Sequence, residues 1–164
     1  MKALMVTPED AMQLLLDRKW IECQPWTTDF RGPVVICAET NPKTAGTIPG
    51  KALCVVNLAY VEPFSEDHLE AAGMTRMPPK GQFAWTFDDL DWIEPFPIPD
   101  DAPVLGTGLF DLNGKLVNRI PADTESTHAL RTYYEPLLTW SDAKHSEEET
   151  REWWEKEMEQ FGES

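Results

Sequence analysis

Apolar residues in the first 120 positions fall mainly into short runs, and glycine, proline or acidic residues separate these runs. This pattern is typical of a chain rich in β strands. Strands are predicted at Trp20–Cys23, Pro33–Ala38, Ala52–Val61 and Gln82–Phe87. The third run is almost continuously apolar, as expected for a strand buried on both faces.

Helix signals interrupt this strand pattern at two places. Thr7 is placed to cap a helix over residues 7–17, with Pro8 at its first position and Ala11, Leu14 and Leu15 on one face. Ser65 is placed to cap a short helix through Ala72, which Gly73 would end.

An Asn113-Gly114 pair between apolar runs indicates a two-residue turn, so strands Gly108–Leu112 and Lys115–Ile120 are predicted to pair as a hairpin. Short strands with a hairpin favour an α+β chain whose centre is a small, largely antiparallel barrel. The helix over residues 7–17 is expected to pack at one opening of that barrel.

Residues 121–164 form a predicted extension beyond the domain at 1–120. A short helix is expected around Ser126–Tyr133, and Ser146 begins a capping box for an acidic amphipathic helix over 147–161. Its apolar stripe repeats at helical spacing, through Trp154, Met158 and Phe161. The stripe either packs on the barrel or forms an exposed face for a partner.

The formal charge of −15 is unevenly distributed. Residues 141–164 hold nine acids and three bases, and residues 88–101 hold six acids and no base. Within the latter, Asp88, Asp89 and Asp91 are interpreted as a solvated turn. The one basic stretch is residues 18–51, with five bases and three acids. Without a broad cationic face, long non-specific nucleic acid is an unsuitable ligand, whereas a locally bound base or nucleotide is compatible.

Other classes of site find little support in the sequence. Three cysteines, Cys23, Cys37 and Cys54, lie in apolar runs without CxxC spacing and are expected to be buried free thiols. The histidines lack metal-ligand spacing, and no phosphate loop, dinucleotide fingerprint or hydrolase elbow is present, so neither metal nor cofactor is expected. No run is long and apolar enough to span a bilayer and no signal peptide is evident, so a cytoplasmic location with no membrane partner is expected.

The segment from Lys19 to Ala38 carries a family resemblance. Lys19 is followed by Glu22, Trp26 and then Arg31-Gly32 before a strand, and the later Gly81–Phe87 and Glu94–Ile98 segments match the same pattern. Over roughly residues 1 to 112 the chain resembles the ASCH domain, a PUA-like barrel. Family members usually have Gly, Arg and Gly where this chain has Arg18, Gln24 and Asp100 or Asp101.

The resemblance implies that Lys19 and Glu22 line a cleft between the barrel and its helices. On an extended segment their odd separation would point them to opposite faces, so a bend is needed to bring both into one pocket. The alternative is a solvated pair at the junction of helix and strand.

Ligand-binding candidates are aromatic and cationic. Trp20, Trp26 and Trp85 are able to stack on a nucleobase, and the alternative for each is core packing. Arg31 is able to meet a phosphate or carboxylate, and a surface salt bridge is its alternative. We expect Lys19, Trp26 and Arg31 to border one cleft, with Glu22 at its wall.

Three functions follow as hypotheses. The first is a non-catalytic module that binds a nucleotide, a modified base or a short single-stranded RNA. The second is suggested by small ASCH-like amidohydrolases that remove an acyl group from the exocyclic amine of cytidine, using a Lys, a Thr three positions on and a downstream Glu. Here Lys19 and Glu22 occupy the first two of those places as candidate catalytic residues. The third is an acidic, nucleic-acid-mimicking protein that binds and regulates a protein partner.

Overall fold

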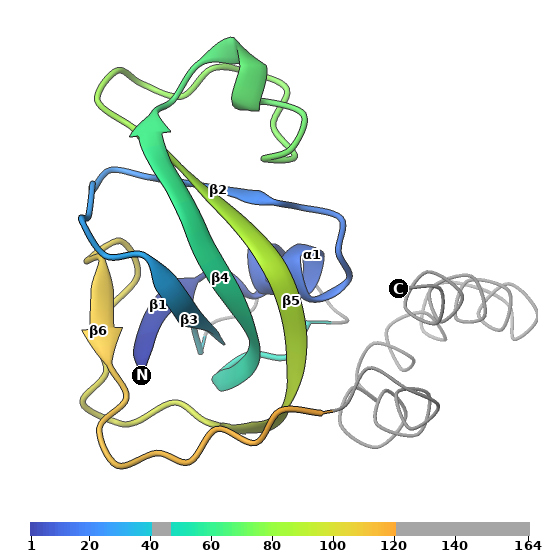
Figure 1. Ribbon diagram of the computed structural model, residues 1–164, viewed down its shortest axis with the longest axis vertical. Coiled ribbons are helices and arrows are strands. Elements are labelled where there is room, and N and C mark those ends of the chain that lie inside the picture. The colour runs from blue at the N-terminus through green and yellow to red at the C-terminus, as the bar shows by residue number, and fades with distance from the viewer. Residues whose placement is uncertain (41–46, 121–164) are drawn as a thin grey trace, which may run out of the picture.

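The computed structural model describes residues 1–40 and 47–120, which build a curled six-stranded sheet with one α-helix (Figure 1). Along the sheet the strand order is β2-β5-β4-β3-β1-β6. The elements in chain order are β1 (Lys2–Val6), α1 (Pro8–Leu15), β2 (Ile21–Gln24), β3 (Gly32–Ala38), β4 (Lys51–Pro63), the 3-10 helix η1 (Glu66–His68), β5 (Phe83–Pro97) and β6 (Leu109–Asp111).

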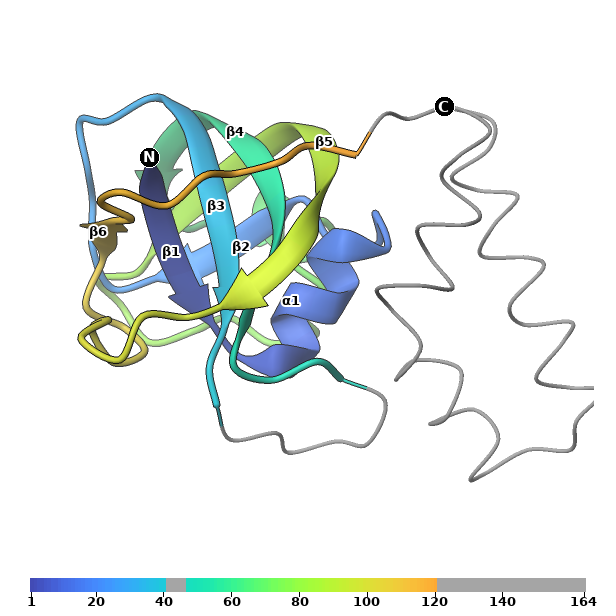
Figure 2. The same ribbon diagram turned by 90° about the horizontal axis from the view of Figure 1, so that it is seen from below.

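The sheet is mixed and curls into a half-barrel. β1 pairs with β3 in parallel, whereas the other strand pairs are antiparallel. Because β2 and β6 are the two ends of the strand order, the half-barrel has an open seam between them (Figure 2). The expected α+β fold with a PUA-like barrel is confirmed, although the sequence did not reveal β1 or its parallel pairing with the predicted strand β3.

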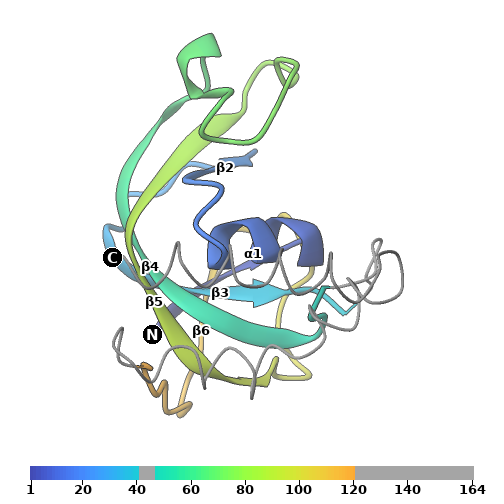
Figure 3. The same ribbon diagram turned by 90° about the vertical axis from the view of Figure 1, so that its right-hand side faces the viewer.

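Helix α1 forms where the cap signals place it. The Thr7 side chain accepts a hydrogen bond from Asp10 N at 3.1 Å, and Pro8 occupies the first turn. The predicted face of Ala11, Leu14 and Leu15 is buried, and α1 lies on the concave side of the sheet (Figure 3). The helix ends at Leu15, two residues before the predicted end.

Both faces of the central strands are covered, which explains their continuous apolar runs. In β1, Leu4 and Val6 join the core cluster that includes α1, whereas Ala3 and Met5 join the cluster on the opposite face. The second cluster is covered by the chain after β5, since Ile98, Ala102, Phe110, Leu112 and Val117 pack against it or belong to it.

Strand β5 corrects the interpretation of the acidic stretch. Asp88, Asp89 and Asp91 lie within this 15-residue strand and not in a turn. Asp89 has φ of 51°, and the pairing of β4 with β5 shifts register nearby. An irregular strand keeps Asp88 and Asp89 exposed while Trp92 and Ile93 return to the core.

The predicted hairpin at Asn113-Gly114 is wrong. The turn is present, but β6 pairs with β1, in the register Lys2↔Asp111. The residues after the turn instead reach β5, where Glu94 N donates to Asn118 O at 2.9 Å and Ile120 N donates to Trp92 O at 2.7 Å. The Asn-Gly pair specified the turn and not the partner of each flanking strand.

The remaining local predictions are partly confirmed. The segment after Ser65 forms only η1, followed by turns, and not a helix through Ala72. The three cysteines are free thiols, with Cys37 and Cys54 buried and Cys23 half-buried.

Several predictions lie outside the described residues. These are the helix around Ser126–Tyr133, the acidic helix over 147–161 and the extension 121–164 as a whole. In the described residues, no helix is long and apolar enough to cross a membrane.

Candidate functional site

A sharp bend after α1 brings Lys19 and Glu22 together. Asp17 adopts the left-handed conformation, with φ of 62°, and Arg18 N donates to Gln13 O at 2.9 Å. The chain then enters β2 with the Lys19 ammonium 3.1 Å from Glu22 Oε2. The same ammonium lies 3.0 Å from Asp10 Oδ1 on the first turn of α1. The bend that the sequence required is therefore present.

The pair is buried and not solvated. Lys19 is 8% exposed and Glu22 is 4% exposed, so the alternative of a solvated surface pair is wrong. Gln24 is also buried and donates its amide to Glu22 Oε1 at 3.4 Å. Among the described residues, neither Glu22 Oε2 nor Gln24 Oε1 accepts a hydrogen bond of good geometry, although Oε2 contacts the ammonium.

These surroundings change the protonation of both groups. The pKa of Glu22 is raised to about 8, because burial, together with a smaller contribution from the nearby Asp10 carboxylate, outweighs the lowering effect of the Lys19 ammonium. Burial alone would lower the pKa of Lys19, but the carboxylates of Glu22 and Asp10 together hold that pKa above its ordinary value. Burial, the largest of these effects, therefore favours the protonated form of Glu22 near neutral pH.

A second place of interest is a cavity of about 350 Å³ at the open seam of the half-barrel. We call it the seam cavity, and its lining residues are Lys2, Trp26, Thr27, Thr28, Phe30, Trp85, Thr107, Gly108 and Leu109. The chain after β2 supplies one side and the chain entering β6 supplies the other. The cavity therefore exists because the two edge strands do not pair.

Two tryptophans hold the wall of the seam cavity together. The indole N–H of Trp26 donates to the Gly106 carbonyl across the seam. The buried Trp85 donates its indole N–H to the Trp26 carbonyl at 2.8 Å. Trp26 nevertheless remains 50% exposed, so part of its ring is available for stacking.

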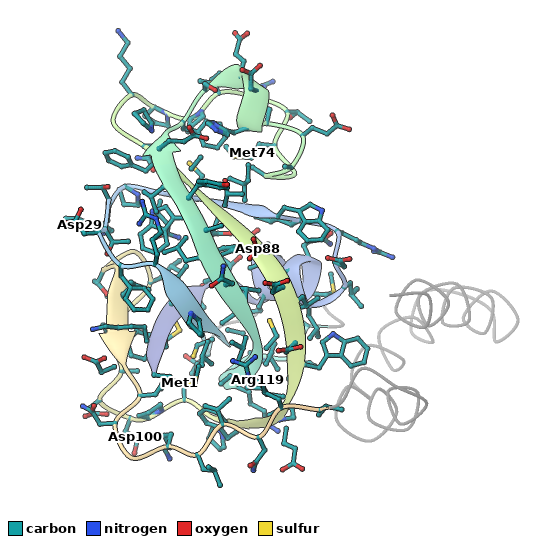
Figure 4. All side chains as sticks on the ribbon, viewed as in Figure 1. Met1, Asp29, Met74, Asp88, Asp100 and Arg119 are labelled. Atoms are coloured by element: carbon teal, nitrogen blue, oxygen red, sulfur yellow. The ribbon has the colours of Figure 1, made fainter. Side chains whose placement is uncertain are left out.

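Arg31 adjoins the seam cavity through the backbone of two lining residues. Its Nη1 donates to the Thr28 carbonyl at 2.8 Å and to the Phe30 carbonyl at 2.7 Å. Figure 4 places the neighbouring Asp29 at the margin of the molecule near β6, well away from Asp88 on β5.

The predicted site residues thus gather at two places. Trp26 and Trp85 line the seam cavity, and Arg31 adjoins it. Lys19 and the exposed Trp20 instead line a small hollow of about 10 Å³ beside the end of α1. Trp85 lies between the two places, because it is the register partner of Glu22 on the neighbouring strand.

Sequence reasoning missed the more distant contributors. Lys2 lies on the unanticipated β1, and Thr107 to Leu109 enter through the unexpected pairing of β6 with β1. Asp10 was also missed. Its contact with Lys19 depends on the bend at Asp17, which the sequence did not place. In the described residues, no three His, Cys, Asp or Glu side chains are grouped to hold a metal ion.

Comparison with solved structures identifies the fold. A mutant form of the ASCH protein from Zymomonas mobilis superposes with a TM-score of 0.53 at 12% identity, covering 69% of this chain and 90% of that one. The ASCH structure from the same organism gives a TM-score of 0.47 at 13% identity, covering 69% and 87%. The chain therefore has a small α+β, PUA-like ASCH fold. No protein-family model and no curated protein matches its sequence.

Proposed function

We propose that this ASCH-like chain is a binding module that holds a nucleotide, a modified base or a short single-stranded RNA, with one base in the seam cavity. The observation that carries the proposal is the cavity itself. Its volume of about 350 Å³ falls within the roughly 300–1,000 Å³ typical of small-molecule sites.

The lining chemistry suits a flat, polar-edged ring. The partly exposed Trp26 offers an aromatic face, and stacking on aromatic side chains is the general way in which proteins hold unpaired bases. Thr28 Oγ1 accepts from Phe30 N at 3.1 Å, which leaves its hydroxyl hydrogen available for a base edge. Gly108 presents backbone without a side chain, and no atom lies within 4 Å of where its Cβ would be.

Charge favours a short ligand over a long one. The chain carries a net −15, so its overall charge would repel an extended phosphate backbone. A single base with one or two phosphates needs only local contacts.

Binding is tested by titrating nucleosides, nucleoside monophosphates and short single-stranded RNAs, followed by calorimetry and NMR of the indole N–H signals. We expect the Trp26 and Trp85 indole signals to shift and Trp26→Ala to weaken binding about tenfold or more, given roughly 1–3 kcal/mol per stacked base. Trp20→Ala is the matched control, because Trp20 is similarly exposed, at 42%, but lies outside the seam cavity. A loss of binding in Trp20→Ala with none in Trp26→Ala would move the ligand to the hollow beside Lys19.

A second candidate is the removal of an acyl group from N4-acylated cytidine, and the buried pair of Lys19 and Glu22 favours it. A carboxyl group with pKa raised to about 8 exchanges protons near neutral pH, as a general acid or base must. In this reaction the ionised fraction of Glu22 would take a proton from water as the water oxygen bonds to the acyl carbon. The same proton would pass to the amine when the C–N bond breaks, which releases cytidine and the carboxylic acid.

Incubation with N4-acetylcytidine and chromatography of the products tests this candidate. Cytidine should form with the wild type and not with Glu22→Gln, while Glu70→Gln, which changes an exposed carboxylate outside the site, should retain the activity. A rate that is unchanged in both Glu22→Gln and Lys19→Ala would reject the hydrolase.

A further inference from the structure

The guanidinium of Arg31 is fixed in one orientation with one edge open. Nη1 is occupied by the two carbonyls of Thr28 and Phe30, at 2.8 and 2.7 Å. Among the described residues, no protein group pairs with Nε or Nη2, and the side chain is exposed. The Nε–Nη2 edge carries two parallel N–H donors, the fork that matches two oxygens of a phosphate.

Two cations lie near the seam cavity, Lys2 and Arg31, and among the described residues only Lys2 has a carboxylate partner. Lys2, the other cation there, lies 3.1 Å from Asp111 Oδ1 and 3.3 Å from Oδ2, so its charge is already paired. Within the described part of the chain, no carboxylate forms an ion pair with Arg31, and this includes the carboxylate of the nearby Asp29.

The backbone beside Arg31 has a conformation that suits glycine. Gly32 follows with φ of 128°, a conformation that side chains rarely adopt, and the nearest atom to a Cβ there is on the Phe30 ring at 3.6 Å. Gln24 stands where the ASCH pattern has arginine, but it is buried and turned to Glu22, so it is not available to an external anion.

We propose that Arg31 is the phosphate anchor of the seam cavity, binding through its Nε–Nη2 edge the phosphate of a nucleotide whose base lies against Trp26. The ligand is then a nucleotide or a phosphorylated RNA segment and not a free base or nucleoside. This inference rests on the proposed function. Fixing the guanidinium by backbone carbonyls reduces the side-chain entropy that phosphate binding would otherwise cost.

The test measures the affinity for a nucleoside and for its 5′-monophosphate by calorimetry, at low and at moderate salt. The proteins compared are the wild type, Arg31→Gln, Arg31→Lys and Arg76→Gln. Wild type should bind the monophosphate about tenfold or more tightly than the nucleoside, as expected for a charge-assisted bidentate pair. Arg31→Gln should abolish this preference, and Arg31→Lys should retain part of it. Inorganic phosphate should compete with the monophosphate and not with the nucleoside.

Arg76→Gln is the matched control, because Arg76 is an exposed arginine outside the seam cavity. This variant should prefer the monophosphate over the nucleoside as strongly as wild type does. Circular dichroism and thermal melting verify that each variant is folded. Equal affinity of wild type for both ligands, or a preference that survives Arg31→Gln, overturns the phosphate anchor and leaves base binding in the cavity standing. Failure of both ligands to bind overturns the anchor together with the proposed function.

Discussion

Glu22 shows at the scale of one residue how burial determines chemistry. A carboxylate beside a single ammonium would ordinarily be ionised, because the opposite charge favours the charged form. Here the loss of water outweighs that attraction, since Asp10 shares the same ammonium and Glu22 is almost fully enclosed. The raised pKa means that the Glu22 carboxyl group can bind a proton near neutral pH, which an ordinary surface salt bridge would not do.

The first prediction concerns stability against pH. The pKa of Glu22 rises from an ordinary 4.5 to about 8 on folding, so between these pH values the folded state holds a proton that the unfolded state has released. Stability should consequently fall as pH rises through this window, by at most on the order of 1 kcal/mol per pH unit. Glu22→Gln should remove this decline and be more stable than wild type at the upper end.

Urea denaturation at several pH values measures this effect. The control is Glu70→Gln, which changes an exposed carboxylate. Its free energy of unfolding should fall with pH as steeply as that of wild type. A Glu22→Gln protein whose stability falls with pH as steeply as wild type would contradict the assignment of the proton to Glu22.

The second prediction concerns Trp85, whose indole N–H supports the Trp26 carbonyl at 2.8 Å. Trp85→Phe should lower the free energy of unfolding by about 2 kcal/mol, because it removes a buried donor and leaves space in the core. Denaturant unfolding tests this, with Trp20→Phe expected to change stability by less than about 0.5 kcal/mol. Equal effects of the two substitutions would show that the buried hydrogen bond adds nothing.

At the scale of elements, the sequence was informative where the cause is local. The Thr7-Pro8 start of α1, the apolar run of β4 and the Asn113-Gly114 turn depend on neighbouring residues, and all three are present. Strand pairing depends on distant residues instead. β6 pairs with β1, because an apolar strand edge was available there, and no residue near the turn indicated it.

The candidate site divides in the same way. Lys19 and Glu22 were found because one short segment carries both, whereas Lys2 and Thr107 come from opposite ends of the described chain and meet only through the β1–β6 pairing. The strand containing Asp88 was misread because its acids are exposed on an irregular strand, which alternation of apolar residues does not reveal.

The third prediction tests the cap of α1. Thr7→Ala removes the acceptor for Asp10 N and should reduce stability by about 1 kcal/mol. Thr75→Ala, an exposed threonine in a loop, serves as the control and should have little effect. Thermal or urea unfolding measures both, and a Thr7→Ala protein as stable as wild type would contradict the capping role.

At the scale of the molecule, two buried thiols report on the integrity of the sheet. Burial raises the pKa of Cys37 to about 12 and holds the pKa of Cys54 well above its ordinary value, so neither forms a reactive thiolate while the sheet is intact. Cys23 is half-buried, with its Sγ 3.8 Å from Gln82 Oε1.

The fourth prediction is therefore that a disulfide reagent at about pH 8, near the ordinary pKa of a thiol, labels at most one thiol of the native protein. Three should react in denaturant, and Cys23→Ser should leave no rapidly labelled thiol in the native state. Cys37 and Cys54 should react together at the rate of global opening. Labelling of Cys37 or Cys54 faster than global unfolding under native conditions would show that the sheet opens locally.

The pairing of Lys2 with Asp111 has a consequence for how the protein is made. β1 leaves the ribosome before the other described strands, yet its antiparallel neighbour β6 is synthesised more than a hundred residues later. Until then one edge of the nascent sheet has no partner, and contacts between such distant residues form slowly. The emerging chain is thus exposed to strand exchange with neighbouring chains during synthesis, and we expect its yield of folded protein to depend on chaperones that shield this edge.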